Sequence, residues 1–210
     1  MKIKLVCFDL DGTLIRGIHS CMFPCILNGK EDGHAPIQVR EESGELDYQA
    51  ADTLRAQLFK GLEERLLTPS FLDIMKPLEN IESTINKLHD ENILSIVITV
   101  GPKQVARAAR DVWGMDSSYG SDYEVADGVF TGRILSFVDP DSKVDCLVDF
   151  CREYGIEPGE CAAVGDGFSD IPLFIHCGKS IAINGSTEAH RIADHGIFTD
   201  DLSDILQFII

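Results

Sequence analysis

Short, strongly apolar segments that alternate with helical patterns constrain the fold of this 210-residue chain more than any other feature. Each apolar segment is rich in valine, isoleucine or alanine and ends in a polar or glycine residue, as a strand buried in a parallel sheet does. The predicted strands are Ile3–Phe8, Ile93–Thr99, Cys161–Val164 and Ser180–Ile183. The predicted helices are Leu78–His89, Pro102–Trp113, Lys143–Tyr154 and Asp170–His176. This order predicts an α/β fold, a Rossmann-like core of three layers with helices on both faces of a parallel sheet.

The segment from Ile15 to Lys76 interrupts this alternation. It shows no obvious buried strand, and it contains a polar, turn-rich stretch at Asn28–Pro36. Amphipathic helix patterns lie near Tyr48–Leu62 and Phe71–Met75. We therefore expect a small helical cap domain, residues 15–76, inserted after the first strand of a core domain formed by residues 1–14 and 77–210.

A hairpin is predicted within Tyr123–Phe137. Asp127-Gly128 separates two short β-prone runs there. An Asp-Gly pair between such runs favours a tight turn between antiparallel strands.

Composition narrows the class of protein. The formal net charge of −17 argues against nucleic acid as a partner, because phosphate backbones are bound through basic patches. No apolar run reaches the roughly 18 residues of a membrane span, and Asp9 and Asp11 end the first apolar run too early for a signal peptide. We expect a cytoplasmic protein without a membrane partner, and the sequence leaves open whether it is a monomer or a homodimer.

The seven cysteines are an odd number without the spacing of a disulfide scaffold, which favours free thiols in a reducing compartment. Their positions are Cys7, Cys21, Cys25, Cys146, Cys151, Cys161 and Cys177. Cys21 and Cys25 lie close to His19, a faint signal of a metal site, but no second pair of ligands follows nearby. We therefore expect these two cysteines to pack inside the cap.

Polar residues follow the predicted strands. Asp9 and Asp11 come directly after the first strand, and Thr99 and Asp166 stand at the ends of later ones. Successive side chains of a strand point to opposite faces, so the two aspartates converge only if the chain bends, which Gly12 permits. Such carboxylates suit Mg²⁺, which binds one or two carboxylates together with substrate phosphate. The alternative is a solvated acidic turn.

Four segments resemble, in order, the motifs of the haloacid dehalogenase (HAD) superfamily. The first motif is an apolar strand followed by DxDGT, present here as FDLDGTL, Phe8–Leu14. The second is a strand ending in Ser or Thr, and SIVIT ends in Thr99. The third is a lysine, Lys143, and the fourth is GDxxxD after a strand, present as AVGDGFSD with Asp166 and Asp170.

The resemblance implies covalent phosphoryl transfer. Asp9 would attack phosphorus in line and form an aspartyl-phosphate. Asp11 would protonate the leaving oxygen and later deprotonate the hydrolytic water. Mg²⁺, held by Asp9, the main-chain carbonyl of Asp11 and Asp166, would neutralise phosphate oxygens and let an acidic chain bind an anion.

Three further residues acquire roles from the resemblance. Thr99 would donate a hydrogen bond to a phosphate oxygen, and Lys143 would stabilise the charge on the transferring group. Asp170 would orient Lys143 or a metal-bound water. The simpler interpretations are that Thr99 only ends a strand, that Lys143 is a solvated helix residue, and that Asp170 is an acid at a helix N-terminus.

Within the superfamily, the chain resembles phosphoserine phosphatase-like capped phosphatases. Asp11 favours a phosphatase, because related dehalogenases need no second acid, and Leu10 stands where transport ATPases have lysine. The cap segment Ser43–Leu62 follows the phosphoserine phosphatase pattern, and Arg55 matches the arginine that holds the substrate carboxylate there. Ser169 replaces the usual asparagine of the last motif. The simpler interpretation of Arg55 is an exposed helix residue.

Two departures bear on the substrate. Ile18 occupies about the place of a glutamate that contacts the amino acid part of the substrate, and Val100-Gly101-Pro102 replaces Gly-Gly after the second motif. The resemblance implies that Gly101 and Ser169, with Arg55, contact the substrate. The loss of a carboxylate that pairs with an ammonium group disfavours an amino-acid substrate.

The expected function is a Mg²⁺-dependent phosphomonoesterase that hydrolyses a small phosphorylated metabolite through Asp9. Three alternatives stay open: a phosphoserine phosphatase proper, a phosphotransferase in which an acceptor alcohol replaces water, and a non-catalytic phosphate-binding regulatory protein. A regulatory protein would be expected to lack a motif residue, and every motif residue is present.

Overall fold

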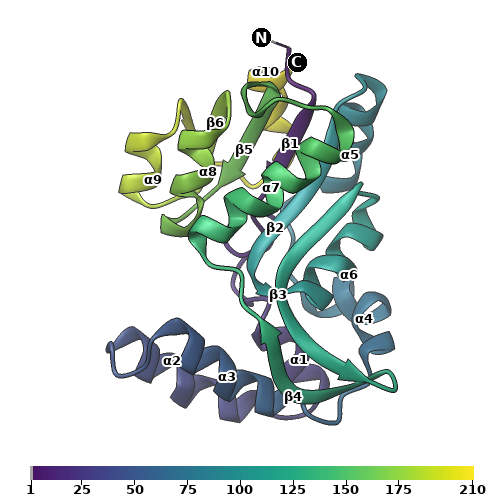
Figure 1. Ribbon diagram of the computed structural model, residues 1–210, viewed down its shortest axis with the longest axis vertical. Coiled ribbons are helices and arrows are strands. Elements are labelled where there is room, and N and C mark those ends of the chain that lie inside the picture. Colours follow the sequence, from purple (N-terminus) through teal and green to yellow (C-terminus); the bar gives the residue numbers. More distant parts are fainter. Residues whose placement is uncertain (1) are drawn as a thin grey trace.

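The computed structural model describes residues 2–210 and has one central sheet of seven strands. Its order is β4-β3-β2-β1-β5-β6-β7, with β1 in the middle (Figure 1). The strands are β1 Leu5–Phe8, β2 Leu94–Pro102, β3 Ser117–Ala126, β4 Val129–Ser136, β5 Cys161–Gly165, β6 Lys179–Ile183 and β7 His195–Ile197. All neighbouring strands pair in parallel except β3 and β4, which form an antiparallel hairpin. The expected α/β fold with a mostly parallel sheet is confirmed.

Two layers of helices cover the sheet because each central strand is apolar on both faces. On β1, Val6 and Phe8 pack toward one cluster of buried residues, and Leu5 and Cys7 pack toward the other. The first cluster contains residues of α5, α6 and α10, and the second contains residues of α7, α8 and α9. The bounds of these helices are α5 Ile81–Asp90, α6 Lys103–Trp113, α7 Pro140–Tyr154, α8 Ile171–His176, α9 Thr187–Ile192 and α10 Leu206–Ile209.

The four predicted strands are present as β1, β2, β5 and β6, with shifts at their ends. The largest shift is in β2, which continues past Thr99 to Pro102. The predicted hairpin is confirmed, and its turn residues Asp127 and Gly128 have φ of 51° and 78°, the left-handed region that a tight two-residue turn requires. The first half of β3 was not predicted, because SSYGS has no apolar run and becomes a strand by pairing with β2.

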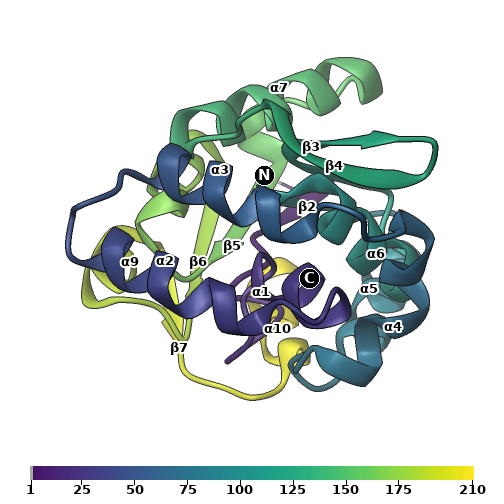
Figure 2. The ribbon, with the colours of Figure 1, turned by 90° about the horizontal axis from the view of Figure 1, so that it is seen from below.

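Four helices fill the segment after β1. They are α1 Met22–Leu27, α2 His34–Glu42, α3 Tyr48–Phe59 and α4 Leu67–Ile74. The helix predicted near Tyr48–Leu62 corresponds to α3, and the pattern at Phe71–Met75 falls mostly within α4. Figure 1 shows α1, α2 and α3 beyond the carboxyl ends of the parallel strands, and Figure 2 shows α2 beside α3.

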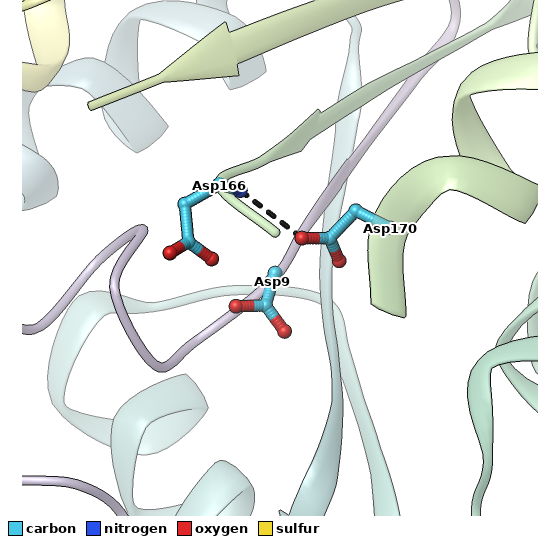
Figure 3. A group of neighbouring side chains, drawn as sticks. All are labelled: Asp9, Asp166 and Asp170. Atoms are coloured by element: carbon cyan, nitrogen blue, oxygen red, sulfur yellow. Dashed lines mark hydrogen bonds between the residues drawn. The ribbon is translucent and has the colours of Figure 1, made fainter. Parts of the chain in front are cut away.

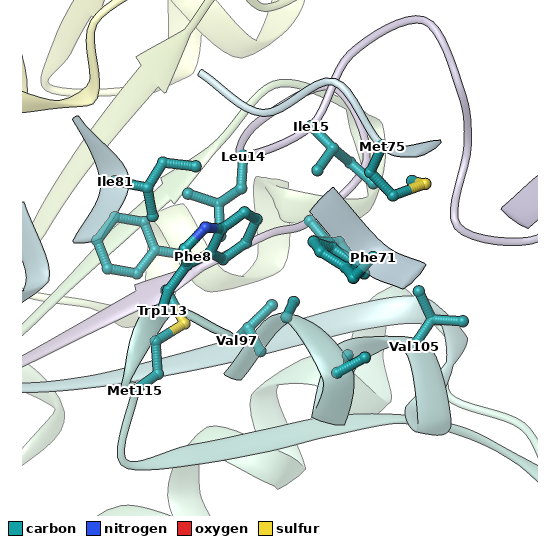
Figure 4. Close-up of a cluster of buried hydrophobic side chains, with 14 of the residues drawn as sticks. Phe8, Leu14, Ile15, Phe71, Met75, Ile81, Val97, Val105, Trp113 and Met115 are labelled. Atoms are coloured by element: carbon teal, nitrogen blue, oxygen red, sulfur yellow. The ribbon is translucent and has the colours of Figure 1, made fainter. Parts of the chain in front are cut away.

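This segment is anchored through aromatic contacts. Phe71 of α4 packs edge-on against Trp113 of α6, with ring centroids 5.3 Å apart (Figure 4). Phe59 of α3 stacks on Tyr123 of the hairpin at 5.0 Å and meets Phe130 edge-on at 5.8 Å. The segment is thus packed on both α6 and the hairpin, while its division from the core at residues 15–76 stays a prediction.

Within residues 2–210, none of the helices combines the length and the apolar character needed to cross a membrane.

Candidate active site

Asp9 lies immediately after β1, at the centre of the sheet edge. Its backbone N–H donates to the carbonyl of Val164 on β5 at 2.9 Å, so the strand pairing fixes its position. The following turn is tight, with Gly12 at φ 87°, and a methyl group on Gly12 would overlap the carboxylate of Asp166. Glycine at this position therefore permits the bend, and it also lets the carboxylate of Asp166 lie against the turn.

Lys143 lies in the first turn of α7 and reaches this edge. Its Nζ donates to Asp9 Oδ1 at 2.6 Å and to Asp170 Oδ1 at 2.8 Å, and its side chain is completely buried. Asp139 caps the helix by accepting from the backbone N–H of Ser142, which fixes where α7 begins. Burial disfavours the charged lysine, but the carboxylates of Asp170 and Asp9 outweigh it and raise the pKa of Lys143. The alternative of a solvated helix residue is wrong.

Three carboxylates meet where β1 and β5 end. Oxygen atoms of Asp9, Asp166 and Asp170 lie within 4.8 Å of one another (Figure 3). Asp170 uses Oδ2 to accept from the backbone N–H groups of Asp166 and Gly167, both at 3.0 Å, and Oδ1 to accept from Lys143. Its two oxygens are thus engaged within the protein, in agreement with a positioning role.

Burial and the crowding of negative charge shift the pKa values of these carboxyl groups. Burial raises the pKa of Asp9 well above its usual value, and the negative charge of Asp170 adds to this, against the opposing effect of Lys143. Burial and the charge of Asp170 also raise the pKa of Asp166 to about 6. A divalent cation between Asp9 and Asp166 would remove this repulsion, and carboxylate oxygens are the donors that Mg²⁺ prefers. The residues present therefore fit such an ion.

Asp11 has different surroundings from Asp9. Its carboxylate accepts from the backbone N–H of Ser20 at 2.6 Å and from the Ser20 hydroxyl. Burial raises the pKa of Asp11, and the two bonds from Ser20 partly offset that rise. The side chain of Asp11 is 23% exposed, against 5% for Asp9, so it faces the open side of the site. Ser20 could not be identified from the sequence, because it stands in a loop that only the fold brings to Asp11.

The end of β2 also contributes residues to the site. Thr99 is buried, and its Oγ1 accepts from the backbone N–H of Gly101 at 3.0 Å. A methyl group on Gly101 would overlap the Ser20 hydroxyl and crowd Thr99. The absence of a side chain at Gly101 thus allows β2 to approach Asp11.

A cavity of about 530 Å³ opens above these residues. From the core it is lined by Asp11, Val100, Gly101, Pro140, Phe168 and Ser169, and from the segment after β1 by His19, Cys21, His34, Gln38, Glu41, Tyr48, Asp52 and Arg55. Ser169 also lies 3.3 Å from Lys143 Nζ, measured at its Oγ. The cavity brings Arg55, Gly101 and Ser169 to the same space as Asp11.

Arg55 is not the exposed helix residue of the simpler interpretation, because it is 5% exposed. Its Nη1 donates to Asp52 Oδ1 at 2.9 Å, and its Nη2 donates to Gln38 Oε1 at 2.7 Å and to Glu41. These three partners could not be predicted from the sequence. Nothing marks them in the sequence, since α2 and α3 meet only in the folded chain.

Of the two cysteines expected to pack inside the cap, Cys25 is buried, whereas Cys21 is partly exposed and lines the cavity. The thiol of Cys25 donates to the carbonyl of Cys21 at 3.4 Å. Cys21 Sγ lies 3.8 Å from Asp52 Oδ1. All seven cysteines are free thiols.

Comparison with known families decides the identity of the chain. A model of the family described as haloacid dehalogenase-like hydrolase matches residues 6–174. The chain belongs to this family. The four motifs that carried the resemblance lie within the matched residues, and the expectation of a HAD-type phosphatase is confirmed.

Relatives of this hydrolase share most of its length. It is 32% identical over 203 residues to a phosphoserine phosphatase of Halobacterium salinarum, covering 95% of this chain and 94% of that one. It is 28% identical to a phosphoserine phosphatase of Saccharomyces cerevisiae, covering 98% of this chain and 67% of that one. A solved structure of a phospho-aspartyl intermediate analogue of phosphoserine phosphatase superposes with a TM-score of 0.80 at 26% identity, covering both chains completely.

Proposed function

We propose that this HAD hydrolase is a Mg²⁺-dependent phosphomonoesterase that acts on a small phosphorylated metabolite through an aspartyl-phosphate on Asp9. The observation that carries the proposal is the asymmetry of the two aspartates. Asp9 is buried against Lys143, whereas Asp11 faces the cavity and is held by Ser20. One carboxylate is thus suited to attack and the other to proton transfer.

In the first step, an oxygen of Asp9 attacks phosphorus, and the bond from phosphorus to the ester oxygen breaks. Lys143 donates to Oδ1 of Asp9, which leaves Oδ2 as the oxygen that would attack. Asp11 donates its proton to the leaving alcohol, and burial favours the protonated form because it raises the pKa of Asp11. The Thr99 hydroxyl and Lys143 would bind the phosphoryl oxygens and stabilise their charge.

In the second step, Asp11 removes a proton from a water molecule that attacks the same phosphorus atom. The bond between phosphorus and the Asp9 oxygen breaks, which releases inorganic phosphate, restores the Asp9 carboxylate and leaves Asp11 protonated for the next cycle. Asp170 takes no part in bond making. It keeps Lys143 and the backbone of Asp166 and Gly167 in place.

Asp9, Asp166 and the main-chain carbonyl of Asp11 would hold Mg²⁺, which when bound neutralises phosphate oxygens. The support is the chemistry of the donor set, together with the burial and the like-charge crowding that raise the pKa values of Asp9 and Asp166. A cation at this place also explains how a chain of net charge −17 binds a phosphate ester.

Phosphoserine is the first candidate substrate, because the two relatives and the solved structure named above are phosphoserine phosphatases. The expected carboxylate contact of Arg55 is part of that candidate function. Free thiols support the proposal that the enzyme works in the reducing cytoplasm.

The test is release of inorganic phosphate from an aryl phosphate, with Mg²⁺ and with chelator. Asp9→Asn should abolish Mg²⁺-dependent release and leave the circular dichroism spectrum unchanged. Asp145→Asn is the matched control, because Asp145 is an exposed aspartate on α7 outside the site. Undiminished turnover in Asp9→Asn would refute the mechanism.

A further inference from the structure

Asp166 is held at both of its main-chain groups. Its backbone N–H donates to Asp170 Oδ2 at 3.0 Å. Its carbonyl accepts from the backbone N–H of Ser186, the N-cap of α9, at 2.8 Å. The first bond comes from the GDxxxD motif itself, whereas the second comes from the turn that follows β6. The position of Asp166 therefore depends on what keeps this turn, residues 184–186, in place.

The turn after β6 lies directly against Asp166. A methyl group on Gly185 would come within 2.5 Å of the carbonyl oxygen of Asp166 and 3.1 Å of its Cα. The absence of a side chain at Gly185 thus allows the close approach that the bond from Ser186 requires. The hydroxyl of Ser186 is used elsewhere, since it accepts from the backbone N–H of Ala189 and caps α9.

Asn184 begins this turn and fixes its conformation. Its φ of 54° lies in the left-handed region, which asparagine adopts more readily than most residues other than glycine. Its backbone N–H donates to the carbonyl of Ile197 at 2.9 Å. Its side chain binds both main-chain groups of Thr199, because Nδ2 donates to the carbonyl at 2.8 Å and Oδ1 accepts from the N–H at 2.9 Å. Three hydrogen bonds thus join Asn184 to the chain around the end of β7.

The segment that receives these bonds is itself anchored. The carbonyl of Thr199 also accepts from Arg16 Nη2, and Arg16 forms an ion pair with Asp200. The backbone N–H of Glu79 donates to the carbonyl of Asp200 at 2.7 Å. Arg16 lies before α1 and Glu79 lies before α5, so two distant parts of the chain hold this segment. Asn184 therefore binds a partner whose position other contacts fix.

We propose that Asn184 is a positioning residue for the metal site, because its bonds to Thr199 hold the turn that keeps Asp166 in place for Mg²⁺. The inference rests on the proposed binding of Mg²⁺ by Asp166 and adds to that site a residue outside the four motifs. Asn184 supplies no ligand, since both polar atoms of its side chain bind Thr199. Residues that orient the ligands of a metal typically change its affinity by about 10–100-fold when they are replaced.

Asn184→Gly isolates the side chain, because glycine adopts a φ of 54° without strain and only the two bonds to Thr199 are lost. Isothermal titration of the folded protein with Mg²⁺ measures the affinity without substrate. We expect the dissociation constant to rise at least about tenfold. Asn92→Gly is the matched control, since Asn92 has a φ of 60°, is exposed and precedes β2 at the opposite end of the strands. This control should keep the wild-type affinity.

A second pair of variants tests the bond to Asp166. Ser186 has a φ of −62°, which proline also adopts, so Ser186→Pro removes the N–H donor at a compatible backbone conformation. Ser186→Ala keeps the N–H and loses only the hydroxyl that caps α9. We expect Mg²⁺ to bind Ser186→Pro at least about tenfold more weakly than Ser186→Ala. Equal affinities in these two variants would overturn the proposal, even if Asn184→Gly does not fold.

Thermal unfolding and the wild-type titration separate the ways in which the argument can fail. A lower unfolding midpoint in Asn184→Gly with unchanged Mg²⁺ affinity would show that Asn184 only stabilises the fold, and the positioning role would be overturned. If the wild type binds no Mg²⁺, the metal-dependent function proposed above fails, and the positioning role fails with it. If the wild type binds Mg²⁺ and hydrolyses the aryl phosphate, but the affinity of Asn184→Gly is unchanged, the function stands and only the role of Asn184 fails.

Discussion

Replacing Lys143 with methionine removes the one cation among residues 2–210 that contacts both Asp9 and Asp170, while keeping most of the side-chain volume. The Nζ atom lies 2.6 Å and 2.8 Å from the two carboxylates, and the lysine side chain is fully buried. Removing one partner of a buried ion pair costs about 3–5 kcal/mol, and here two carboxylates lose their partner. We therefore expect the free energy of unfolding of Lys143→Met to fall by at least about 3 kcal/mol at pH 7.5 without divalent cations.

The pH dependence of this loss has a definite sign. Burial and the charge of Asp170 already raise the pKa of Asp9 above its unfolded value of 3.8, and removing Lys143 raises it further. A carboxyl group with a raised pKa binds more protons in the folded state than in the unfolded state, so stability falls as pH rises from the unfolded pKa toward the folded one. The variant should therefore lose less stability at pH 5 than at pH 7.5.

Urea unfolding followed by circular dichroism, with chelator at both pH values, measures this effect. Lys87→Met is the matched control, because Lys87 is half-exposed and forms a surface pair with Glu91. That control should change stability by no more than about 1 kcal/mol. A loss as small as the control's in Lys143→Met, or a loss that does not depend on pH, would refute the assignment of Lys143 as the counter-ion of the site.

Three further predictions concern the same edge of the sheet. Without Mg²⁺, the free energy of unfolding of the wild type should fall as pH rises from about 4 to about 6, because the pKa of Asp166 rises from 3.8 to about 6 on folding. Mg²⁺ should make the free energy of unfolding depend less on pH in this range. Denaturant titrations at stepped pH measure this dependence, and a dependence that Mg²⁺ does not change would contradict the prediction. Gly101→Ala should lower kcat/KM for the aryl phosphate at least about tenfold, because its methyl group meets the Ser20 hydroxyl beside Asp11; wild-type kinetics would contradict this. Ser20→Ala removes a donor that lowers the pKa of Asp11, so the limb of the pH–rate profile that Asp11 controls should move to higher pH, and a move to lower pH would argue against the pairing.

The sequence alone predicted the core of the fold because its central strands depend on local information. The segment containing β1 is apolar on both faces and ends in Asp9, and a run of this length and composition is typical of a strand buried in a parallel sheet. The carboxyl ends of parallel strands share one edge, so the convergence of Asp9, Thr99 and Asp166 followed from strand order. Gly12 could likewise be recognised as the place where the chain bends.

Elements stabilised by distant contacts could not be predicted in the same way. The segment Ser117–Ser121 has no apolar run, and it becomes the start of β3 because β2 offers a parallel edge beside it. Ser20 carries no signal of its own, yet the path of the chain from β1 into α1 places it against the carboxylate of Asp11. Both depend on where other segments lie.

The class of reaction could be predicted from the sequence, since Asp9, Asp11, Lys143 and Asp166 follow one another in the order of the motifs of the haloacid dehalogenase-like hydrolases. The surroundings of Arg55, in contrast, depend on how the helices pack. The resemblance to phosphoserine phosphatases implied that Arg55 holds a substrate carboxylate, and the packing of α2 on α3 brings Glu41 and Asp52 onto that arginine. The net charge of the cavity wall depends on charged residues from both α2 and α3, and these residues come together only when the two helices pack.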